Sequence, residues 1–177
     1  MKGKKRIQDG PRIYVADLSA YNAGKLHGTW IAADRGVDEI HAEIKAMLAE
    51  SPEPDAEEWA IHDYEGFGGV KLGEYEDLEE VARIGELLNE HGPLFGKLVD
   101  HFGRDVDEAV RAMEENYAGE FDSLSDWAQQ FAEDTGSADC GPYTNYIDWE
   151  SVARDAEMNG DVFTIETDGK VHVFHGH

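Results

Sequence analysis

Most of the side chains in this sequence that could do chemistry are carboxylates. The chain has 39 Asp and Glu residues among 177, against 15 Lys and Arg. They are densest between Asp105 and Asp139, where eleven carboxylates stand beside a single cation, Arg111. Paired carboxylates catalyse glycoside hydrolysis when the fold fixes their separation. With 39 candidates, however, any two satisfy some spacing along the chain, so spacing singles out no catalytic pair.

Other kinds of site have weaker support. No window has the alternating acids, central glycine and closing glutamate of a calcium loop. The glycines at residues 66–69 lack the third glycine of a dinucleotide-binding fingerprint. Cys140 has no basic partner nearby in the sequence. The histidines His172, His175 and His177 lack a defined fourth metal ligand. We therefore predict no enzymatic activity, no cofactor and no metal site, and keep a carboxylate-based hydrolase as an alternative.

The net charge limits what this chain can bind. It is −24 overall, and five cations lie in the first twelve residues with only Asp9 opposing them. Residues 13–177 therefore carry 38 carboxylates and 10 cations, a net charge of −28. Such a surface repels nucleic acid and destabilises the compact state by self-repulsion. Because solubility needs only about 2 to 8 charges in a small domain, we expect the excess to serve binding, with a halophilic origin as the alternative.

The sequence also indicates a compartment. Cys140 is the one cysteine, so an internal disulfide is impossible and a reducing environment is the default. No apolar run approaches the roughly 18 residues of a membrane span, and the basic start lacks the apolar centre of a signal peptide. We expect a cytoplasmic protein that binds no membrane.

Apolar periodicity predicts the elements that position the acids in the first two thirds of the chain. Residues 1–11 are predicted to be a flexible basic tail. The predicted elements that follow are strands at 12–18, 26–32 and 59–64, a turn at 19–24, and helices at 37–48, 78–88 and 94–102. A glycine-rich segment, 65–73, is predicted as the loop into a second unit. The solvent-facing sides of the first two helices carry Glu43, Glu50, Glu79, Glu86 and Glu90.

The acidic stretch itself has the apolar spacing of folded helices. One stripe recurs at i, i+3, i+4, i+7 and i+11 and consists of Val106, Ala109, Val110, Met113 and Tyr117. A second consists of Leu124, Trp127, Ala128 and Phe131. A last helix is predicted over residues 149–156. We therefore expect these carboxylates to lie on a folded surface, where their positions are fixed.

The last residues before the C-terminus predict a β-hairpin. Asp168-Gly169 stands between two β-prone runs, 162–167 and 170–174, and this dipeptide is a strong two-residue turn signal. The resulting register places Glu166 opposite Val171 and Thr164 opposite Val173. Because side chains alternate between faces, it assigns three large apolar residues to the predicted core side, namely Phe163, Ile165 and Phe174.

These elements predict an α/β (α+β) fold, with short antiparallel sheets and amphipathic helices in an elongated chain of three small domains. The predicted boundaries are 12–70 for an N-terminal α/β domain, 71–103 for a small helical domain and 104–177 for a C-terminal α/β domain with the acidic stretch. DNA carries the same 28 charges in about 14 base pairs, or about 48 Å of duplex. A compact sphere of this chain is only about 40 Å across. An elongated chain would let the carboxylates follow a phosphate track.

Several long segments resemble the ArdA antirestriction proteins. They are RIYVADLSAYNAGKLHGTWI, HDYEGFGG, ENYAGEFDSLSDWA and YIDWESVARDAEMNGDVFTIE with KVHVF, and together they extend over most of the chain from Arg12 to Phe174. The resemblance implies an elongated three-part α/β fold and a homodimer whose acidic surface mimics DNA. It implies a function as well, inhibition of type I restriction-modification enzymes by occupation of their DNA-binding groove. It also places an antirestriction motif on residues 114–126, whereas the basic tail departs from the family pattern.

From these observations we predict two sets of functional residues. The predicted DNA-mimic acids are Glu43, Glu50, Glu79, Glu86, Glu90, Asp107, Glu108, Glu114, Glu115, Glu120, Asp122 and Asp126. The predicted dimer interface, where aromatics interrupt the acidic surface, comprises Tyr117, Phe121, Tyr143 and Tyr146. The alternative partner is another DNA-binding protein, such as a nucleoid protein or a repressor.

Overall fold

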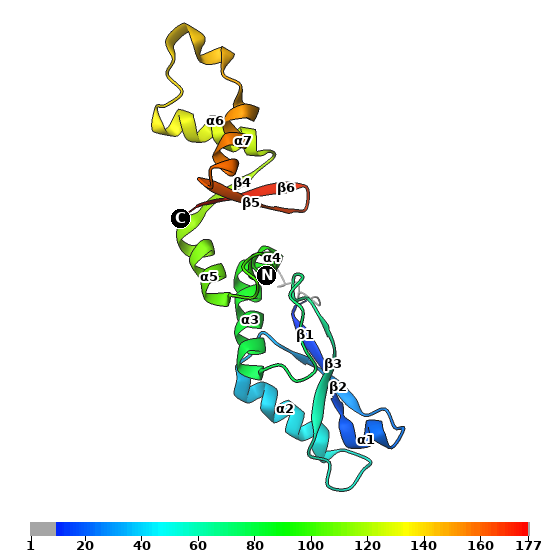
Figure 1. Cartoon of the computed structure of the whole chain (residues 1–177). Helices are drawn as coiled ribbons and strands as arrows, with labels where there is room; N and C mark the ends of the chain where they lie inside the picture. The colour runs from blue at the N-terminus through cyan, green and yellow to red at the C-terminus, as the bar shows by residue number, and fades with distance from the viewer. Residues whose placement is uncertain (1–9, 177) are drawn as a thin grey trace, which may run out of the picture. The chain divides into compact units, whose positions relative to one another are not determined.

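The computed structural model describes residues 10–176, which form two compact units, one up to Val106 and one from Asp107 onward (Figure 1). Both units combine helices with a short antiparallel sheet, which confirms the predicted α+β class. The finer division into three domains in an elongated chain stays a prediction, and the predicted basic tail lies almost wholly outside the described residues.

The N-terminal unit contains one three-stranded sheet and the helices that cover it. Its elements are β1 (Arg12–Asp17), α1 (Leu18–Asn22), β2 (Gly28–Ala32), α2 (Val37–Ala49), β3 (Trp59–Glu65), α3 (Leu78–His91) and α4 (Pro93–His101). Strand β1 is central, in the order β2-β1-β3, and both of its partners are antiparallel to it. The predicted turn at 19–24 is mostly a helix, α1, because the Asp17 side chain caps the first backbone N–H groups.

Helices α2 and α3 bury the apolar stripes that their sequences predict. Ile40, Ile44 and Met47 are buried on α2 at i, i+4 and i+7. Helix α3 packs so closely that a Cβ atom on Gly85 would lie 2.1 Å from the carbonyl oxygen of Ala33, directly after β2. Only glycine fits at this position, although glycine in the middle of a helix is unfavourable by about 1 kcal/mol relative to alanine.

The glycine-rich segment after β3 also serves packing. Phe67 is buried, and the chain beside it runs so close to α4 that a Cβ atom on Gly96 would lie 2.6 Å from the Phe67 carbonyl oxygen. Gly68 contributes to the same close approach of two backbones, since a Cβ atom there would lie 2.8 Å from the Pro93 carbonyl oxygen at the start of α4.

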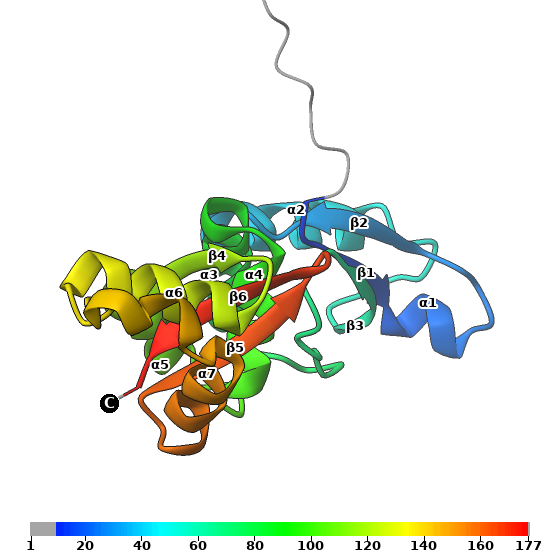
Figure 2. The same ribbon diagram turned by 90° about the horizontal axis from the view of Figure 1, so that it is seen from above.

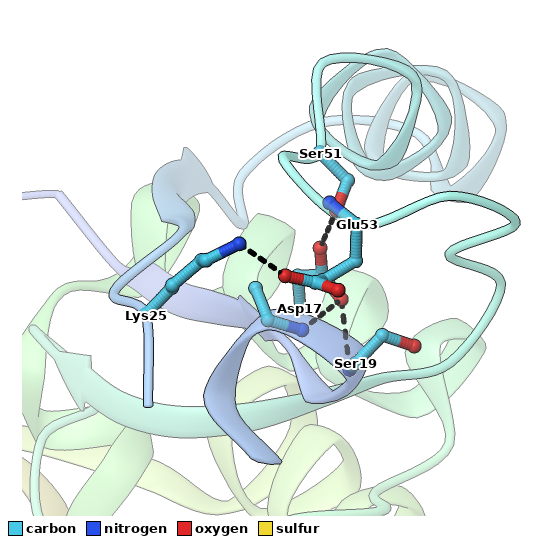
Figure 3. Close-up of polar contacts among 6 residues, drawn as sticks. Asp17, Ser19, Lys25, Ser51 and Glu53 are labelled. Carbon is cyan, nitrogen blue, oxygen red and sulfur yellow. Dashed lines mark hydrogen bonds and ion pairs between the residues drawn. The ribbon is translucent and has the colours of Figure 1, made fainter. Parts of the chain in front are cut away.

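A buried carboxylate network connects residues 17–20 with residues 51–53 in the N-terminal unit (Figure 3). Asp17 Oδ1 accepts hydrogen bonds from the backbone N–H groups of Ser19, at 2.9 Å, and Ala20, at 3.2 Å. The Ser51 hydroxyl donates to Asp17 Oδ2 and in turn accepts the N–H of Glu53 at 3.0 Å. Burial raises the pKa of Asp17, but hydrogen bonds from Ser51, Ala20 and Ser19 outweigh it and hold the pKa below its usual value. A side chain that is wholly shielded from solvent thus stays charged.

The C-terminal unit has a second three-stranded sheet, in the order β4-β6-β5, with all pairs antiparallel. Its elements are α5 (Val106–Arg111), a π-helical turn η1 (Ala112–Asn116), β4 (Tyr117–Phe121), α6 (Leu124–Thr135), a 3-10 helix η2 (Gly141–Tyr146), α7 (Trp149–Met158), β5 (Val162–Thr167) and β6 (Lys170–His175). Helices α6 and α7 lie side by side (Figure 2). Ser123 caps α6 and Asp148 caps α7 through side-chain hydrogen bonds to backbone N–H groups.

The hairpin register is confirmed, because Glu166 pairs with Val171 and Thr164 with Val173. The prediction that the face with Phe163, Ile165 and Phe174 is the core side of the hairpin is only partly correct. Val162 and Val173, on the opposite face, join Trp127, Ala128 and Ala153 in the core under the helices. The face that carries Phe163, Ile165 and Phe174 is also covered, since Phe174 is fully buried and stacks on Phe163 with ring centroids 5.0 Å apart. Both faces of this small sheet therefore bury apolar side chains.

In the acidic stretch, the structure corrects the last residue of each of the two predicted apolar stripes. Tyr117 does not extend the helical stripe, because the π-helical turn ends the helix and residue 117 begins β4. Phe131 is at the predicted spacing on α6 but is 45% exposed, because the neighbouring sheet and α7 cover Trp127 and Ala128 and leave the next turn open.

We predict that Asp17→Asn lowers the stability of the N-terminal unit by about 2 kcal/mol at neutral pH, the usual contribution of hydrogen bonds to a charged group. Because the folded pKa is depressed, this contribution is present above the unfolded Asp pKa, about 3.9, and is lost as the pH falls through the folded value. Hydrogen exchange of the β1 amides, compared with wild type at each pH, measures the difference.

Asp100→Asn, on the exposed side of α4, is the matched control and should change exchange by less than about 0.5 kcal/mol. An equal loss in both variants, or a loss for Asp17→Asn that persists in acid, would contradict a charged Asp17.

Candidate acidic binding surface

The predicted acids of the N-terminal unit lie on α2 and α3. Glu79, Glu86 and Glu90 are exposed at i, i+7 and i+11 along one side of α3, while Val81 and Ile84 are buried on the other. Glu79 also stands in the first turn, where the helix dipole favours a negative charge. The buried side of α3 therefore fixes the direction in which these three carboxylates point.

The two acids on α2 have different surroundings. Glu43 is half-buried and pairs with Arg35 at 2.5 Å, whereas Glu50 is exposed just after the helix ends. Both line a shallow cavity of about 320 Å³ with His27, whose Nε2 lies 2.7 Å from the Met47 carbonyl oxygen. The charge of Glu43 is thus partly neutralised, and Glu50 contributes more to the surface potential.

The acids of the C-terminal unit come from consecutive short elements. Asp107 and Glu108 stand in the first turn of α5, Glu114 and Glu115 on the π-helical turn, and Glu120 on β4. The π-helical turn places Glu114 and Glu115 in solvent. Glu108 is half-buried and accepts a hydrogen bond from Arg111 at 2.6 Å.

Asp122 lies between β4 and α6, and Asp126 lies in the first turn of α6. Asp126 is exposed and accepts a hydrogen bond from the capping Ser123 hydroxyl at 2.6 Å. Asp122 pairs with Lys170 Nζ at 2.6 Å, across from the hairpin turn. The hydrogen bond and the charge of Lys170 lower the pKa of Asp122, and the same contact raises the pKa of Lys170.

Cations are too few to neutralise this surface. From residue 107 onward the chain has 17 carboxylates and three Lys or Arg residues. Each cation already has an acidic neighbour: Arg111 and Lys170 as described, and Arg154 with Asp155 at 3.8 Å. Most of the carboxylates therefore carry uncompensated charge.

His172, which the sequence suggested only as a weak metal ligand, lies beside Glu120. The Tyr117 hydroxyl lies 2.8 Å from His172 Nδ1, and His172 Nε2 lies 3.8 Å from Glu120 Oε2. His172 is only 7% exposed, because alternation along β6 places it on the face with Phe174. Burial raises the pKa of Tyr117, and the nearby charge of Glu120 raises it further. Alternation in KVHVFH is the signal that could have predicted this burial.

The four aromatics predicted at the dimer interface lie in different settings. Tyr143 and Tyr146, on η2, are 70% and 84% exposed. Phe121 packs on the core under the helices, whereas Tyr117 packs on Phe174 on the opposite face of the sheet, with centroids 5.1 Å apart. The register irregularity between Tyr117 and Gly119 produces this change of face. The structure thus brings Tyr143 and Tyr146 together on one element and separates Tyr117 from Phe121.

The residues considered for other kinds of site have the following surroundings in the part of the chain that the structure describes. Within residues 10–176, no group of three His, Cys, Asp or Glu side chains could hold a metal ion. His177, the third residue of the histidine group, lies outside the described residues. Cys140 is exposed. No described helix is both long and apolar enough to cross a membrane.

Comparison with known proteins agrees with the resemblance noted in the sequence. A search of curated proteins gives no match. The family model described as "Antirestriction protein (ArdA)" matches residues 13–170. That match extends over both structural units and contains all twelve predicted acids. The chain therefore belongs to the ArdA family of antirestriction proteins.

Proposed function

We propose that this protein is a DNA mimic that occupies the DNA-binding groove of a type I restriction-modification enzyme and thereby blocks restriction. The observation that carries the proposal is the uncompensated charge of the C-terminal unit, where 17 carboxylates face three cations that already have acidic neighbours. A basic groove that binds DNA phosphates attracts such a surface for the same electrostatic reason. Membership of the ArdA antirestriction family favours a restriction enzyme as the protein that carries this groove.

The fold supports this proposal because it fixes the direction of the charges. Acids on α3 and on the π-helical turn stand opposite buried apolar residues, so they cannot turn inward. A folded backbone already orients the Cα–Cβ bonds of these acids, which lowers the entropic cost of association relative to a disordered acidic chain. The proposed mechanism is competitive binding without a chemical step.

We predict that neutralising acids weakens inhibition gradually at first and steeply in combination. Any single change among Glu86→Gln, Glu90→Gln, Glu114→Gln and Glu115→Gln should cost less than about 1 kcal/mol in affinity, the scale of an exposed charge pair. All four together should weaken binding much more. Competition between this protein and labelled DNA for a purified type I enzyme measures both.

A matched control is Lys25→Gln with Glu53→Gln, which removes an existing ion pair outside the twelve predicted acids and leaves the net charge unchanged. It should retain inhibition. If one substitution alone abolished inhibition, a localised site such as that of a carboxylate hydrolase would replace the collective mimic.

The salt dependence of binding provides a second test. Release of condensed counterions drives DNA binding, and a protein surface condenses fewer ions than duplex DNA. Between about 50 and 200 mM salt, we predict that log affinity of the enzyme for this protein falls less steeply than that for DNA. A slope as steep as that of DNA would contradict this prediction, and a flat slope would show that apolar contacts dominate instead.

We further propose that the protein acts as a homodimer, because one chain offers charge for only about 14 base pairs and a two-fold copy would double the acidic track. Sedimentation equilibrium at micromolar concentration is expected to show a dimer. Tyr143→Asp with Tyr146→Asp should give folded monomer, since both side chains are exposed and no core is disturbed. Tyr75→Asp, 75% exposed in the N-terminal unit, is the control that should stay dimeric. An unchanged dimer in the double variant would move the interface elsewhere.

A further inference from the structure

An apolar groove lies between α6 and α7 at one end of the C-terminal sheet. Its volume is about 400 Å³. We call it the α6–α7 groove, and its lining includes Trp127, Phe131, Val152, Ala156, Val162 and His175. All of them belong to the C-terminal unit. The volume is within the range of pockets that hold ligands, roughly 300 to 1,000 Å³. This surface contains none of the twelve predicted DNA-mimic acids.

The groove exposes large apolar side chains that the fold holds in place. Phe131 and Val152, from α6 and α7, are 45% and 43% exposed. Phe131 stacks on Trp127, with ring centroids 5.4 Å apart and an angle of 25° between the rings, and its ring also lies 5.9 Å from His175. Neighbouring exposed apolar residues on a soluble domain mark an interaction surface. A partner would meet an apolar surface that needs little rearrangement.

The charges around the groove decide which occupant fits. Asp161 lines it, and Asp134 stands three residues beyond Phe131 on α6. Asp155, which has Arg154 as a neighbour at 3.8 Å, stands three residues beyond Val152 on α7. Residues three apart on a helix are neighbours on its surface, so both acids stand close to the apolar floor. A second copy of this groove would bring the same acids with it, and nucleic acid or an anionic lipid would be repelled. A cationic occupant has the complementary charge.

We propose that the α6–α7 groove binds an amphipathic segment of a partner protein, which inserts large apolar side chains between the helices and places Lys or Arg beside Asp134, Asp155 and Asp161. This is the helix-in-groove mode of peptide recognition, in which apolar anchors recur at helical spacing. The contact goes beyond DNA mimicry, because a phosphate track offers no such anchor. It gives the protein a way to favour one protein partner over other basic surfaces.

A designed peptide tests the groove directly. The probe is a fluorescent amphipathic helix of Leu and Lys with its leucines in one stripe, and the control peptide has the same composition with the leucines scattered. Fluorescence anisotropy with the full chain at about 150 mM salt measures both dissociation constants. We expect the striped peptide to bind about tenfold more tightly or better, since charge alone treats the two peptides alike.

Substitutions in the groove test where the striped peptide binds. Phe131→Asn and Val152→Asn, on opposite walls, should each weaken binding of the striped peptide about threefold or more, whereas Tyr75→Asn, an exposed aromatic of the other unit, should not. Circular dichroism confirms that each variant is folded. Two variants keep the test decisive if one fails to fold.

Equal affinity for both peptides, or unchanged affinity in both groove variants, would overturn the proposal. So would sedimentation of the protein alone as a dimer that Phe131→Asn converts to monomer, because a second copy would then be the occupant. The assay contains no restriction enzyme, so its failure leaves DNA mimicry untouched, and failure of DNA mimicry leaves the groove untouched.

Discussion

Mutual repulsion among carboxylates is the constraint on which the rest of this structure depends. With a net charge of −24, every helix and strand must form against an electrostatic cost that grows as the chain becomes compact. The fold lowers this cost by keeping the acids other than Asp17 at the surface of the described residues, where the dielectric constant is high. Asp17 is the buried exception among the acids of the described residues, and three hydrogen bonds to its carboxylate compensate its burial.

Because the acids are exposed to solvent, the apolar cores of the two units must hold the backbone of the acids in position. In the N-terminal unit, α3 packs so closely on the end of β2 that only glycine fits at residue 85. In the C-terminal unit, the sheet buries apolar side chains on both faces, which is unusual for three short antiparallel strands with one helical layer. This packing holds the backbone beneath the acids in place. A fixed backbone is what the proposed competition with the regular phosphates of a duplex requires.

Ten large hydrophobic side chains of the described residues are exposed. Phe131 and Val152 differ from the other eight because they line the α6–α7 groove. The acidic surface and the α6–α7 groove would then contribute different terms to binding. Long-range charge governs how fast a basic partner arrives, and a desolvated apolar anchor governs how long it stays.

The sequence by itself determined what depends on neighbours along the chain. Helical spacing predicted α2, α3 and α7, Asp168-Gly169 predicted the hairpin and its register, and long segments identified the antirestriction family. The exposure of acids such as Glu86 and Glu115 followed from the same periodicity.

Only the tertiary structure decided the features that join distant residues. Ser51 reaches Asp17 across 34 positions, and His172 reaches Tyr117 across 55, so no local pattern could pair them. The strand over residues 117–121 forms because β6 offers an edge to pair with, and that partner overrides the helical spacing before it. Phe131 has the spacing of a core residue and yet is exposed, because burial depends on which elements pack over a helix, and periodicity describes only the helix itself.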